Sequence, residues 1–440
     1  MFVKKIETEN IKHPFEMLRA LKGESAFLLE SLSHDQKNGK YSYFGKGPFR
    51  ELYLEDDKAF EKVNGVTKEI SKTYFEEIQS VVGTKKDENY PYDFNGGLIG
   101  YFSYDFIRNF ENIGTRKEKL SPSKDSHLFY VDTFFVCDHE KNELFFVSEE
   151  ECDVPIFTTN RPLEKIIENE EMKINTTYSK EEFEEMVVKA KKHIEIGDSF
   201  QIVLSQSFLI NTKRSSEELY ETLRQKNPSP YMYFLDFGNY QILGSSPESL
   251  VKVKDGLVYT NPIAGTRRRG GNSEEDALLA TELLNDEKER AEHYMLVDLG
   301  RNDIGAVSKR GTVKVEKFSE IEYFPHVIHL VSEVVGELEK HSLDALKMCL
   351  PAGTVSGAPK IRAMQIINRL EKYERGFYGG AVGYFSRNGN IDCALTIRTM
   401  MKKDEKIYIQ TGAGIVTDSV PEKEYEETLH KAKGLFEVFV

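Results

Sequence analysis

The chain has 440 residues, a net charge of −14 and no tryptophan, and this acidic balance argues against a nucleic-acid backbone as its partner. No apolar run approaches the ~20 residues that span a bilayer, and the N-terminus lacks the apolar segment of a secretory signal, so no membrane association is expected. The cysteines, Cys137, Cys152, Cys349 and Cys393, show no metal-type or redox spacing, which indicates reduced thiols in a cytoplasmic protein.

Short strands separated by loops are predicted for the first part of the chain, residues 1–175. One helix is expected over Lys58–Val82, although Gly65 interrupts it. The polar stretch Glu168–Thr177 is the predicted boundary between this N-terminal region and the region 176–440. The strand candidates are Phe27–Leu29, Tyr41–Gly45, Asn95–Phe102, Leu128–Cys137 and Glu143–Val147.

The second part of the chain mixes helices and strands. Ser179 and Glu182 predict a capping box for the helix that starts near Tyr178. Asn261–Gly271 is expected to be a basic, glycine-flanked loop. The further helices are predicted at Ser216–Gln225, Ser273–Gly300 with a break at Asn285-Asp286, Ser342–Cys349 and Ile361–Leu370. The strands are predicted at Phe200–Ile210, Tyr231–Phe237, Tyr240–Gly244, Ser246–Val251, Tyr378–Phe385 and Asp392–Met401. Many strands without regular βαβ alternation indicate an α+β fold.

The stretch Tyr408–Lys433 is predicted to form a strand, a glycine turn and a helix. Gly412 and Gly414 would let the backbone turn tightly and bring its N–H groups close to an anion. Ser419 is the expected helix cap, and Pro421 suits the first turn.

Two pairs of glutamates with the same spacing lie on separate predicted helices. Glu289 and Glu292 are three residues apart, as are Glu424 and Glu427, so each pair projects from one helical face. If the two helices face each other, the four carboxylates form an oxygen-only site, which favours Mg²⁺. The alternative is that each pair is a solvated acidic face of its helix.

A series of motifs along the chain carries a family resemblance. They are Leu28–Ser31, Asn227–Met232, Ser246–Glu248, Pro262–Arg267, Glu292–Asp303 and Gly353–Lys360. Their order and their residues resemble those of the chorismate-utilising enzymes, and within that family those of the large subunits of anthranilate synthases. The resemblance is dense from Tyr178 to Lys433 and thinner before Asn175. The chain departs from the usual pattern at Arg268 and Lys40. The resemblance implies large antiparallel sheets packed with helices, the two regions being interleaved in one compact unit.

The resemblance implies Mg²⁺-dependent amination of chorismate at C2, loss of the C4 hydroxyl and elimination of pyruvate to give anthranilate, the first committed step of tryptophan biosynthesis. Glu292 and Glu427 match the direct ligands of Mg²⁺. Glu289 and Glu424 match residues that bind the ion through water or position the direct ligands. The metal would hold the ring carboxylate while ammonia attacks.

Further positions match the catalytic and substrate-binding residues of the family. Glu248 matches the general acid that protonates the departing hydroxyl, and it must be held protonated. Its alternative role is an ordinary loop carboxylate. Arg398, Tyr378 and the glycine stretch at Gly412 and Gly414 match the residues that hold the enolpyruvyl carboxylate.

The ring end of the substrate is assigned to a second group. Gly265 and Thr266 match the residues that hold the ring carboxylate, and Thr354 and His329 match pocket residues near the reacting ring. His329 lies in an apolar run, so the alternative is a core histidine.

Two residue identities favour ammonia attack at C2. Gln201 stands where water-activating relatives carry a lysine base, and an amide cannot deprotonate water. Ala264 stands where aminodeoxychorismate synthases typically carry a lysine nucleophile. Aminodeoxychorismate synthase stays the alternative activity because some members lack that lysine. A binding module that senses an amino acid without catalysis is the alternative from another class.

Glutamine hydrolysis requires a nucleophile that this chain does not offer, since none of its cysteines sits in a tight turn with a histidine partner. A separate glutamine amidotransferase subunit is therefore the expected source of ammonia.

The resemblance also implies a feedback site for tryptophan. Leu29, Glu30 and Ser31 match one side of that pocket, and Asn227, Pro228, Tyr231 and Met232 match the other. Ser31 would bond the charged groups of the amino acid, and Tyr231 would box its indole. The alternative is a core strand over Phe27–Leu29 followed by a turn.

Overall fold

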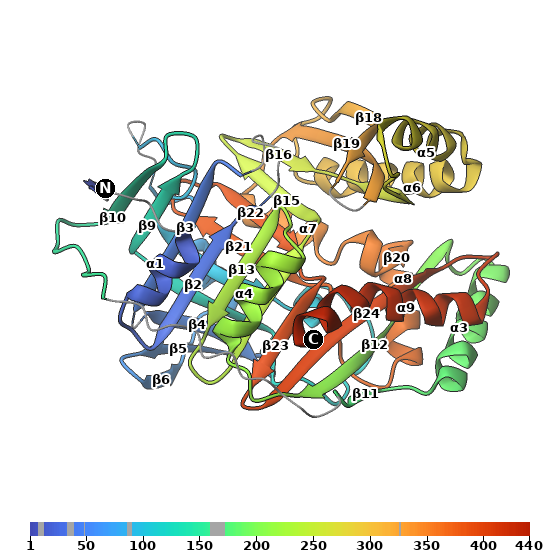
Figure 1. Cartoon of the computed structure of the whole chain (residues 1–440), viewed down its shortest axis with the longest axis horizontal. Helices are drawn as coiled ribbons and strands as arrows, with labels where there is room; N and C mark the ends of the chain where they lie inside the picture. Colours follow the sequence, from blue (N-terminus) through green and yellow to red (C-terminus); the bar gives the residue numbers. More distant parts are fainter. Residues whose placement is uncertain (8–12, 33–38, 48, 86–89, 159–171, 325–326) are drawn as a thin grey trace.

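Two large antiparallel sheets form the body of the molecule (Figure 1). The structure is a computed structural model that describes residues 1–7, 13–32, 39–47, 49–85, 90–158, 172–324 and 327–440. Each sheet has 12 strands and combines strands from before and after residue 175. The predicted α+β class with large antiparallel sheets is confirmed. The first residues of the predicted boundary Glu168–Thr177 lie outside the described residues.

The first sheet runs from the N-terminal strand at one edge to the strand Ile174–Thr176 at the other. Its order is β1 (Phe2–Ile6), β10 (Glu143–Ser148), β9 (Thr133–Asp138), β3 (Tyr41–Gly47), β2 (Ser25–Glu30), β13 (Tyr231–Asp236), β14 (Gln241–Ser246), β23 (Thr399–Lys403), β24 (Lys406–Ile415), β12 (Gln201–Asn211) and β11 (Ile174–Thr176), with β20 (Gly357–Ala358) pairing beside β12.

The second sheet has the order β17 (Ile263–Arg268), β19 (Val327–Glu337), β16 (Leu257–Thr260), β15 (Ser249–Lys254), β22 (Ile391–Leu395), β21 (Ala381–Ser386), β7 (Gly97–Phe102), β8 (Ser126–Val131), β4 (Arg50–Glu55), β5 (Lys58–Val63) and β6 (Val66–Glu69), with β18 (Lys314–Tyr323) pairing beside β19. Strands β17, β18 and β19 carry helices α5 (Ser273–Asn285) and α6 (Glu287–Gly305) in a lobe at one end of the molecule (Figure 1).

Apolar packing joins the two sheets face to face. Buried side chains of the first sheet, such as Phe27 and Tyr233, form one cluster with Ile99 and Phe129 of the second sheet. The outer face of the first sheet is covered by α1 (Pro14–Ala20), α4 (Ser216–Lys226) and α9 (Pro421–Phe436). The outer face of the second sheet packs on α2 (Tyr74–Gln79), α6 and α7 (Ser342–Cys349). The remaining helices are α3 (Lys180–Glu195), α8 (Lys360–Leu370) and the short 3-10 turns η1 (Tyr104–Asn109), η2 (Gly353–Val355) and η3 (Glu437–Phe439).

Local sequence signals explain several element ends. Ser179 caps α3 and Glu182 completes the capping box, as predicted. The break predicted at Asn285-Asp286 separates α5 from α6, and the Asp286 side chain accepts hydrogen bonds from the first amides of α6. The hairpin predicted around Gly238-Asn239 joins β13 to β14.

Several local predictions are wrong. The helix expected over Lys58–Val82 is the hairpin β5–β6 followed by the short α2. The loop expected at Asn261–Gly271 contains strand β17, because Ile263–Arg268 pair with β19. The glycine turn expected at Gly412–Gly414 is absent, because β24 continues to Ile415 in pairing with β12. In the part of the chain that the structure describes, no helix has both the length and the apolar character needed to cross a bilayer.

Candidate active site

A cavity of about 550 Å³ lies between the end of the first sheet and the lobe that carries α6. Helices α6 and α9 line it from opposite sides, and both are visible at the right of Figure 1. Every residue predicted to bind the metal, to bind the substrate or to act in catalysis lines this one cavity: Gln201, Glu248, Gly265, Thr266, Glu289, Glu292, His329, Thr354, Tyr378, Arg398, Gly412, Gly414, Glu424 and Glu427. These residues come from elements that are distant in the sequence.

Glu248 lies in the turn between β14 and β15 and points its carboxyl group into the cavity wall. Thr354 Oγ1 of η2 donates a hydrogen bond to Glu248 Oε1 at 2.8 Å. Burial raises the pKa of Glu248 to about 7, and the Thr354 hydrogen bond and the charge of Lys431 oppose that rise. A carboxyl group with this pKa is half protonated near neutral pH, which suits a general acid.

Arg398 is held in the cavity by an unusual backbone conformation. Its φ is +51°, a left-handed value that a residue with a long side chain rarely adopts. The Arg398 carbonyl oxygen accepts a hydrogen bond from the Ser245 amide at 3.0 Å, which ties this turn to β14. Strain of this kind concentrates at functional sites, and here it presents an exposed guanidinium group to the cavity.

His329 of β19 and the bulge of β17 form one polar corner of the cavity. The strand register shifts between Ala264 and Thr266, and Gly265 takes a φ of +70°. His329 Nδ1 lies 2.8 Å from the Gly265 carbonyl oxygen and 3.2 Å from Thr266 Oγ1. A carbonyl oxygen only accepts, so Nδ1 carries the proton. Burial lowers the pKa of His329, which favours the neutral ring with Nε2 unprotonated.

Gly412 and Gly414 contribute to the cavity because a side chain at either position would collide with a neighbouring residue. A Cβ atom at Gly412 would lie 2.7 Å from the Tyr378 hydroxyl oxygen, and one at Gly414 would lie 2.7 Å from Gln201 Nε2. The two glycines therefore leave room for the side chains of Tyr378 and Gln201 above a continuous strand. Gln201 Nε2 also donates to Glu292 Oε1 at 3.1 Å, and its own Oε1 is buried without a hydrogen-bond partner.

The two glutamate pairs reach the cavity from α6 and α9. Burial and the neighbouring Glu292 raise the pKa of Glu289. Burial is also the main cause that raises the pKa of Glu424, with Glu427 adding to it. Carboxyl groups that repel one another in this way bind a cation or a proton. Ser419 is not the helix cap, because α9 starts at Pro421 with Val420 as its cap residue and the Ser419 hydroxyl accepts from the Val416 amide.

The donor set of the cavity fits a hard divalent cation. The four glutamates predicted as ligands offer oxygen atoms only, with no histidine or cysteine among them. Within the described residues, no three His, Cys, Asp or Glu side chains lie close enough to hold a metal by themselves. The arrangement therefore fits an ion such as Mg²⁺ that takes further oxygen atoms from water and from a bound carboxylate.

Sequence reasoning missed several cationic residues of the cavity wall. Lys288, Lys423 and Lys431 line the cavity together with the glutamates. Lys431 Nζ donates to the Gly412 carbonyl oxygen at 3.0 Å and lies 3.4 Å from Glu427 Oε1. The i,i+4 spacing of Glu427 and Lys431 could have indicated this pair.

A second cavity, of about 180 Å³, lies between the two sheets. Of the residues predicted for tryptophan binding, Leu29, Glu30, Ser31, Tyr231 and Met232 line it. Tyr43, Tyr233 and Tyr384 surround the same space with aromatic rings. The cavity is thus an aromatic box with polar groups at its edge.

The side chains of some predicted tryptophan-binding residues point elsewhere. Strand alternation turns the Glu30 carboxylate to the outer face, where it accepts from Tyr220 Oη at 2.8 Å and from Arg224 Nε at 2.7 Å. Met232 packs in the cluster on that same outer face. Asn227 and Pro228 do not line the cavity, and Asn227 Nδ2 instead donates to the Gly434 carbonyl oxygen at 2.7 Å.

Comparison with known proteins shows the family of the chain. The sequence profile of the family described as chorismate binding enzyme matches residues 24–437. The chain therefore belongs to the family of chorismate-binding enzymes, as its motifs suggested.

Curated relatives show a more particular similarity. The chain is 44% identical to anthranilate synthase component 1 of Acetivibrio thermocellus, over 97% of this chain and 92% of that protein. It is 40% identical to anthranilate synthase component 1 of Lactococcus lactis, over 99% of each chain.

Solved structures share the fold. The crystal structure of anthranilate synthase component I from Streptococcus pneumoniae superposes with a TM-score of 0.81 at 38% identity, covering 98% of this chain and 100% of that chain. The isochorismate synthase MenF of Escherichia coli has a TM-score of 0.78 at 18% identity over 100% of this chain and 94% of that chain, which shows the same fold.

Proposed function

We propose that the chain is the large subunit of an anthranilate synthase, which aminates chorismate at C2 with ammonia and then eliminates pyruvate. The observation that carries this proposal is the Glu248–Thr354 pair, because a carboxyl group with a pKa of about 7 stands in a cavity that also holds Arg398 and four glutamates. Protonated Glu248 donates its proton to the departing C4 hydroxyl, which leaves as water.

Chorismate is a dicarboxylate, and the cavity offers separate polar groups for its two ends. Arg398 and Tyr378 hold the enolpyruvyl carboxylate near Gly412 and Gly414. Gly265 and Thr266 hold the ring carboxylate, with His329 fixing the bulge through its bond to the Gly265 carbonyl oxygen. This division orients the ring so that its C4 hydroxyl meets Glu248.

Glu292 and Glu427 are the proposed Mg²⁺ ligands, with Glu289 and Glu424 binding through water or positioning them. When bound, Mg²⁺ neutralises the ring carboxylate and withdraws charge from the ring during attack. The glutamates and the lysines of the cavity wall keep the charges of this region close to balance before the substrate enters.

The nucleophile of this proposal is ammonia, because an amide, Gln201, stands where water-activating relatives carry a lysine base, and β17 carries no lysine. Gln201 is held to Glu292 and is an amide, so it cannot activate water. Ala264 lines the cavity at the position where a lysine would attack the ring. Aminodeoxychorismate synthase is the alternative that a product assay separates from this one.

Ammonia comes from a separate glutamine amidotransferase subunit in this proposal. Cys137, Cys349 and Cys393 are buried, and burial raises the pKa of each thiol, to about 12 for Cys137, so these thiols are poor nucleophiles. The complex is expected to work in the cytoplasm.

The cavity between the sheets is the proposed feedback site for tryptophan. Tyr43, Tyr231 and Tyr233 give aromatic faces for the indole, and Ser31 stands at the edge for the charged groups of the amino acid. A ligand there would press the two sheets apart or together and so alter the cavity that both sheets build.

One product assay tests the proposed activity. Purified protein is incubated with chorismate, MgCl₂ and ammonium chloride, and the products are separated and identified. Anthranilate supports the proposal, and an aminodeoxychorismate product assigns the alternative activity. Intact chorismate, together with measurable tryptophan binding, would assign the chain to the amino-acid sensors.

A further inference from the structure

A buried ion pair lies directly behind the cavity wall. Glu371 follows the end of α8, and Arg375 stands four residues later in the turn that leads to Tyr378. Their side chains are 5% and 2% exposed, and Arg375 Nη2 lies 2.6 Å from Glu371 Oε1. Arg375 Nε completes a two-point contact with Glu371 Oε2 at 2.9 Å. Replacing such a pair with apolar side chains is often neutral for stability, so its presence calls for a reason other than stability.

The guanidinium group of Arg375 ties two wall segments together. Nη1 donates to the Val355 carbonyl oxygen, and Nη2 donates to the Val203 carbonyl oxygen at 2.6 Å. Val355 follows Thr354 in η2, and Val203 lies two residues after Gln201 in β12. One planar cation therefore fixes the backbone on which the hydrogen-bond donor to Glu248 is mounted.

Arg375 also backs the ring of Tyr378. Its guanidinium carbon lies 5.7 Å from the centre of the Tyr378 ring and 4.7 Å from that of Tyr104. Arginine stacks on such rings through its flat, weakly hydrated cation. Arg375 therefore supports the Tyr378 ring on the side that faces away from the cavity.

Glu371 extends the same network to the cavity floor. Its Oε1 accepts from the Ser205 amide at 2.8 Å and from Ser205 Oγ at 2.9 Å. Ser205 Oγ in turn accepts from Nε2 of Gln410, a residue of the cavity wall, at 2.9 Å. Because every member is satisfied, the network is rigid.

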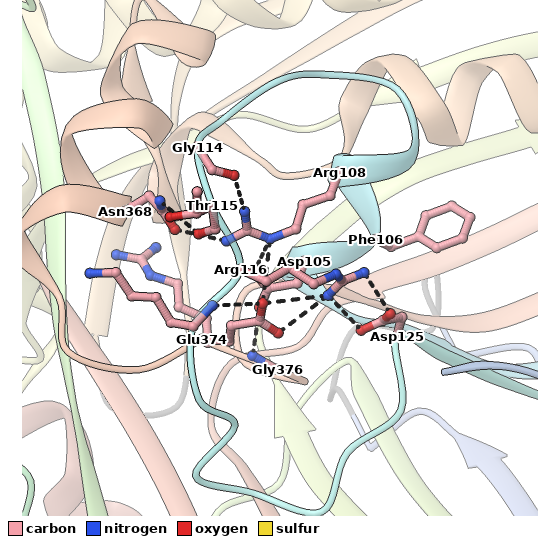
Figure 2. Close-up of polar contacts among 12 residues, drawn as sticks. Asp105, Phe106, Arg108, Gly114, Thr115, Arg116, Asp125, Asn368, Glu374 and Gly376 are labelled. Atoms are coloured by element: carbon pink, nitrogen blue, oxygen red, sulfur yellow. Dashed lines mark hydrogen bonds and ion pairs between the residues drawn. The ribbon is translucent and has the colours of Figure 1, made fainter. Parts of the chain in front are cut away.

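The other side of the turn is clamped by a cluster that Figure 2 shows. Arg116 Nη1 lies 3.4 Å from Glu374 Oε2, and Arg108 Nε lies 3.7 Å from Glu374 Oε1. The Gly376 amide donates to Asp105 Oδ2 at 3.0 Å. Glu374 therefore anchors the turn to the segment 105–125, while Arg375 reaches from the same turn toward the cavity.

We infer that Arg375, paired with Glu371, is a positioning residue that fixes Thr354 against Glu248 and Tyr378 against the substrate space. The inference rests on the proposed function, since it assigns the pair a part in the protonation step. Arg375 touches neither substrate nor reacting atoms in this assignment. Its effect passes through the Val355 peptide to the Thr354 hydroxyl and through the stacked ring to Tyr378.

The first test is Arg375→Lys, which keeps the charge opposite Glu371 but has no planar fork to reach both carbonyl oxygens. The variant is expected to fold and to lose roughly 10- to 100-fold in kcat for chorismate consumption, since small misplacements cost that much. The Michaelis constant for chorismate should change less, because only Tyr378 of the proposed binding residues is displaced, whereas Arg398, Gly265 and Thr266 lie on other elements.

The pH dependence of kcat/KM separates positioning from general damage. The Thr354 hydrogen bond holds the pKa of Glu248 down, so its loss moves the falling limb of the profile to higher pH. Lys431, Glu292, His329 and Arg398 share the cavity with Glu248 and keep their positions in the variant. Tyr378 shifts, but burial raises the pKa of its hydroxyl group, so it stays neutral across the profile. Thr354→Val should move the limb in the same direction.

A matched control exists at Arg214. Arg214 Nη1 donates to the Val438 carbonyl oxygen at 2.9 Å, and Nε lies 3.5 Å from Glu218 Oε1, an i,i+4 partner like Glu371. This pair lies away from both cavities, so Arg214→Lys should leave kcat and the pH profile unchanged.

The neutral double variant Glu371→Gln/Arg375→Gln tests the same point without an unpaired buried charge. It is expected to fold and to be at least as impaired as Arg375→Lys. A folded variant of either kind with unchanged kcat and pH profile would overturn the inference, and so would failure of both variants to fold, which would make the pair purely structural. A wild-type protein that consumes no chorismate would instead refute the proposed function, and the inference would fall with it.

Discussion

The two cavities of this molecule differ in how their charges are satisfied. In the cavity between α6 and α9, Arg398 and Glu427 are exposed to the empty space. Burial raises the pKa of Glu289 and of Glu424, and the neighbouring Glu292 and Glu427 add to that rise. In the cavity between the sheets, charged groups are paired across short distances. Lys254 lies 2.8 Å from Asp93, and Lys252 lies 3.3 Å from Asp392. Tyr231 Oη also donates to Asp392 at 3.1 Å.

This difference indicates different tasks. Four carboxyl groups crowded around one cavity are costly until an ion or a ligand is bound among them, even with lysines nearby, which suits a site for a charged substrate and a metal. A cavity with aromatic walls, whose charged side chains form ion pairs with one another, is stable when empty. It binds a ligand when the ligand takes the place of one member of such a pair, which suits a regulatory site. Substitutions in the first cavity should therefore act on turnover, and those around the second on stability or inhibition.

The largest effect is expected for Glu427→Gln, which removes a proposed metal ligand. Turnover of chorismate at saturating ammonium should fall to the level measured without Mg²⁺, because a neutral amide binds a hard cation poorly. Initial rates across a Mg²⁺ titration check this. Glu426→Gln is the matched control, since Glu426 is exposed on the same helix and does not line the cavity. Near-normal turnover in Glu427→Gln would discredit the metal assignment.

Glu248→Gln should lower kcat by roughly 10²- to 10⁴-fold, the usual contribution of a general acid. The pH dependence of kcat/KM in the wild-type protein provides a second test of this role. Protonated Glu248 is the active form, so kcat/KM should fall as pH rises through about 7, the pKa of that group in the folded protein. The residual activity of the variant should lack this falling limb. A wild-type profile that is flat from pH 6 to 8.5 would remove Glu248 from the role of acid.

The family motifs were enough to predict which residues line the first cavity. The spacing of residues along the chain, taken without those motifs, predicted far fewer of them. The i,i+3 glutamate pairs predicted shared helical faces, but nothing in their spacing places α6 opposite α9. Gly412 and Gly414 were assigned to a turn because glycine favours turns. Their actual reason, contact with the side chains of Tyr378 and Gln201, depends on packing between distant segments.

Other errors could have been avoided. Asn64 and Gly65 both have positive φ, +51° and +78°, and Asn-Gly between alternating residues is a strong hairpin signal that the predicted helix over Lys58–Val82 ignored. Leu29 and Glu30 are neighbours in a strand and must face opposite sides, so both could not point into one pocket. The position of Asn227 depends on its hydrogen bond to Gly434 of α9 and was not predictable locally.

Arg224→Gln tests whether the buried charge of Glu30, a residue of the strand that lines the second cavity, serves stability. The variant leaves Glu30, whose side chain is 1% exposed, without its cation, which should cost about 3–5 kcal/mol in the free energy of unfolding. Urea denaturation measures the loss, and turnover of the folded fraction should be unchanged. Arg19→Gln is the control, because its partner Glu217 is 38% exposed and the loss should stay under about 1 kcal/mol.

The smallest effect on turnover is expected for Ser31→Leu, which alters the edge of the cavity between the sheets. Uninhibited turnover should stay within about twofold of wild type, since Ser31 does not line the first cavity. The inhibition constant for tryptophan should rise about 10- to 100-fold, because a hydrogen bond to a charged group contributes about 1.5–3 kcal/mol. Inhibition assays at fixed chorismate measure this constant. Unchanged inhibition would remove Ser31 from the pocket, and a parallel loss of turnover would show that the two cavities cannot be separated.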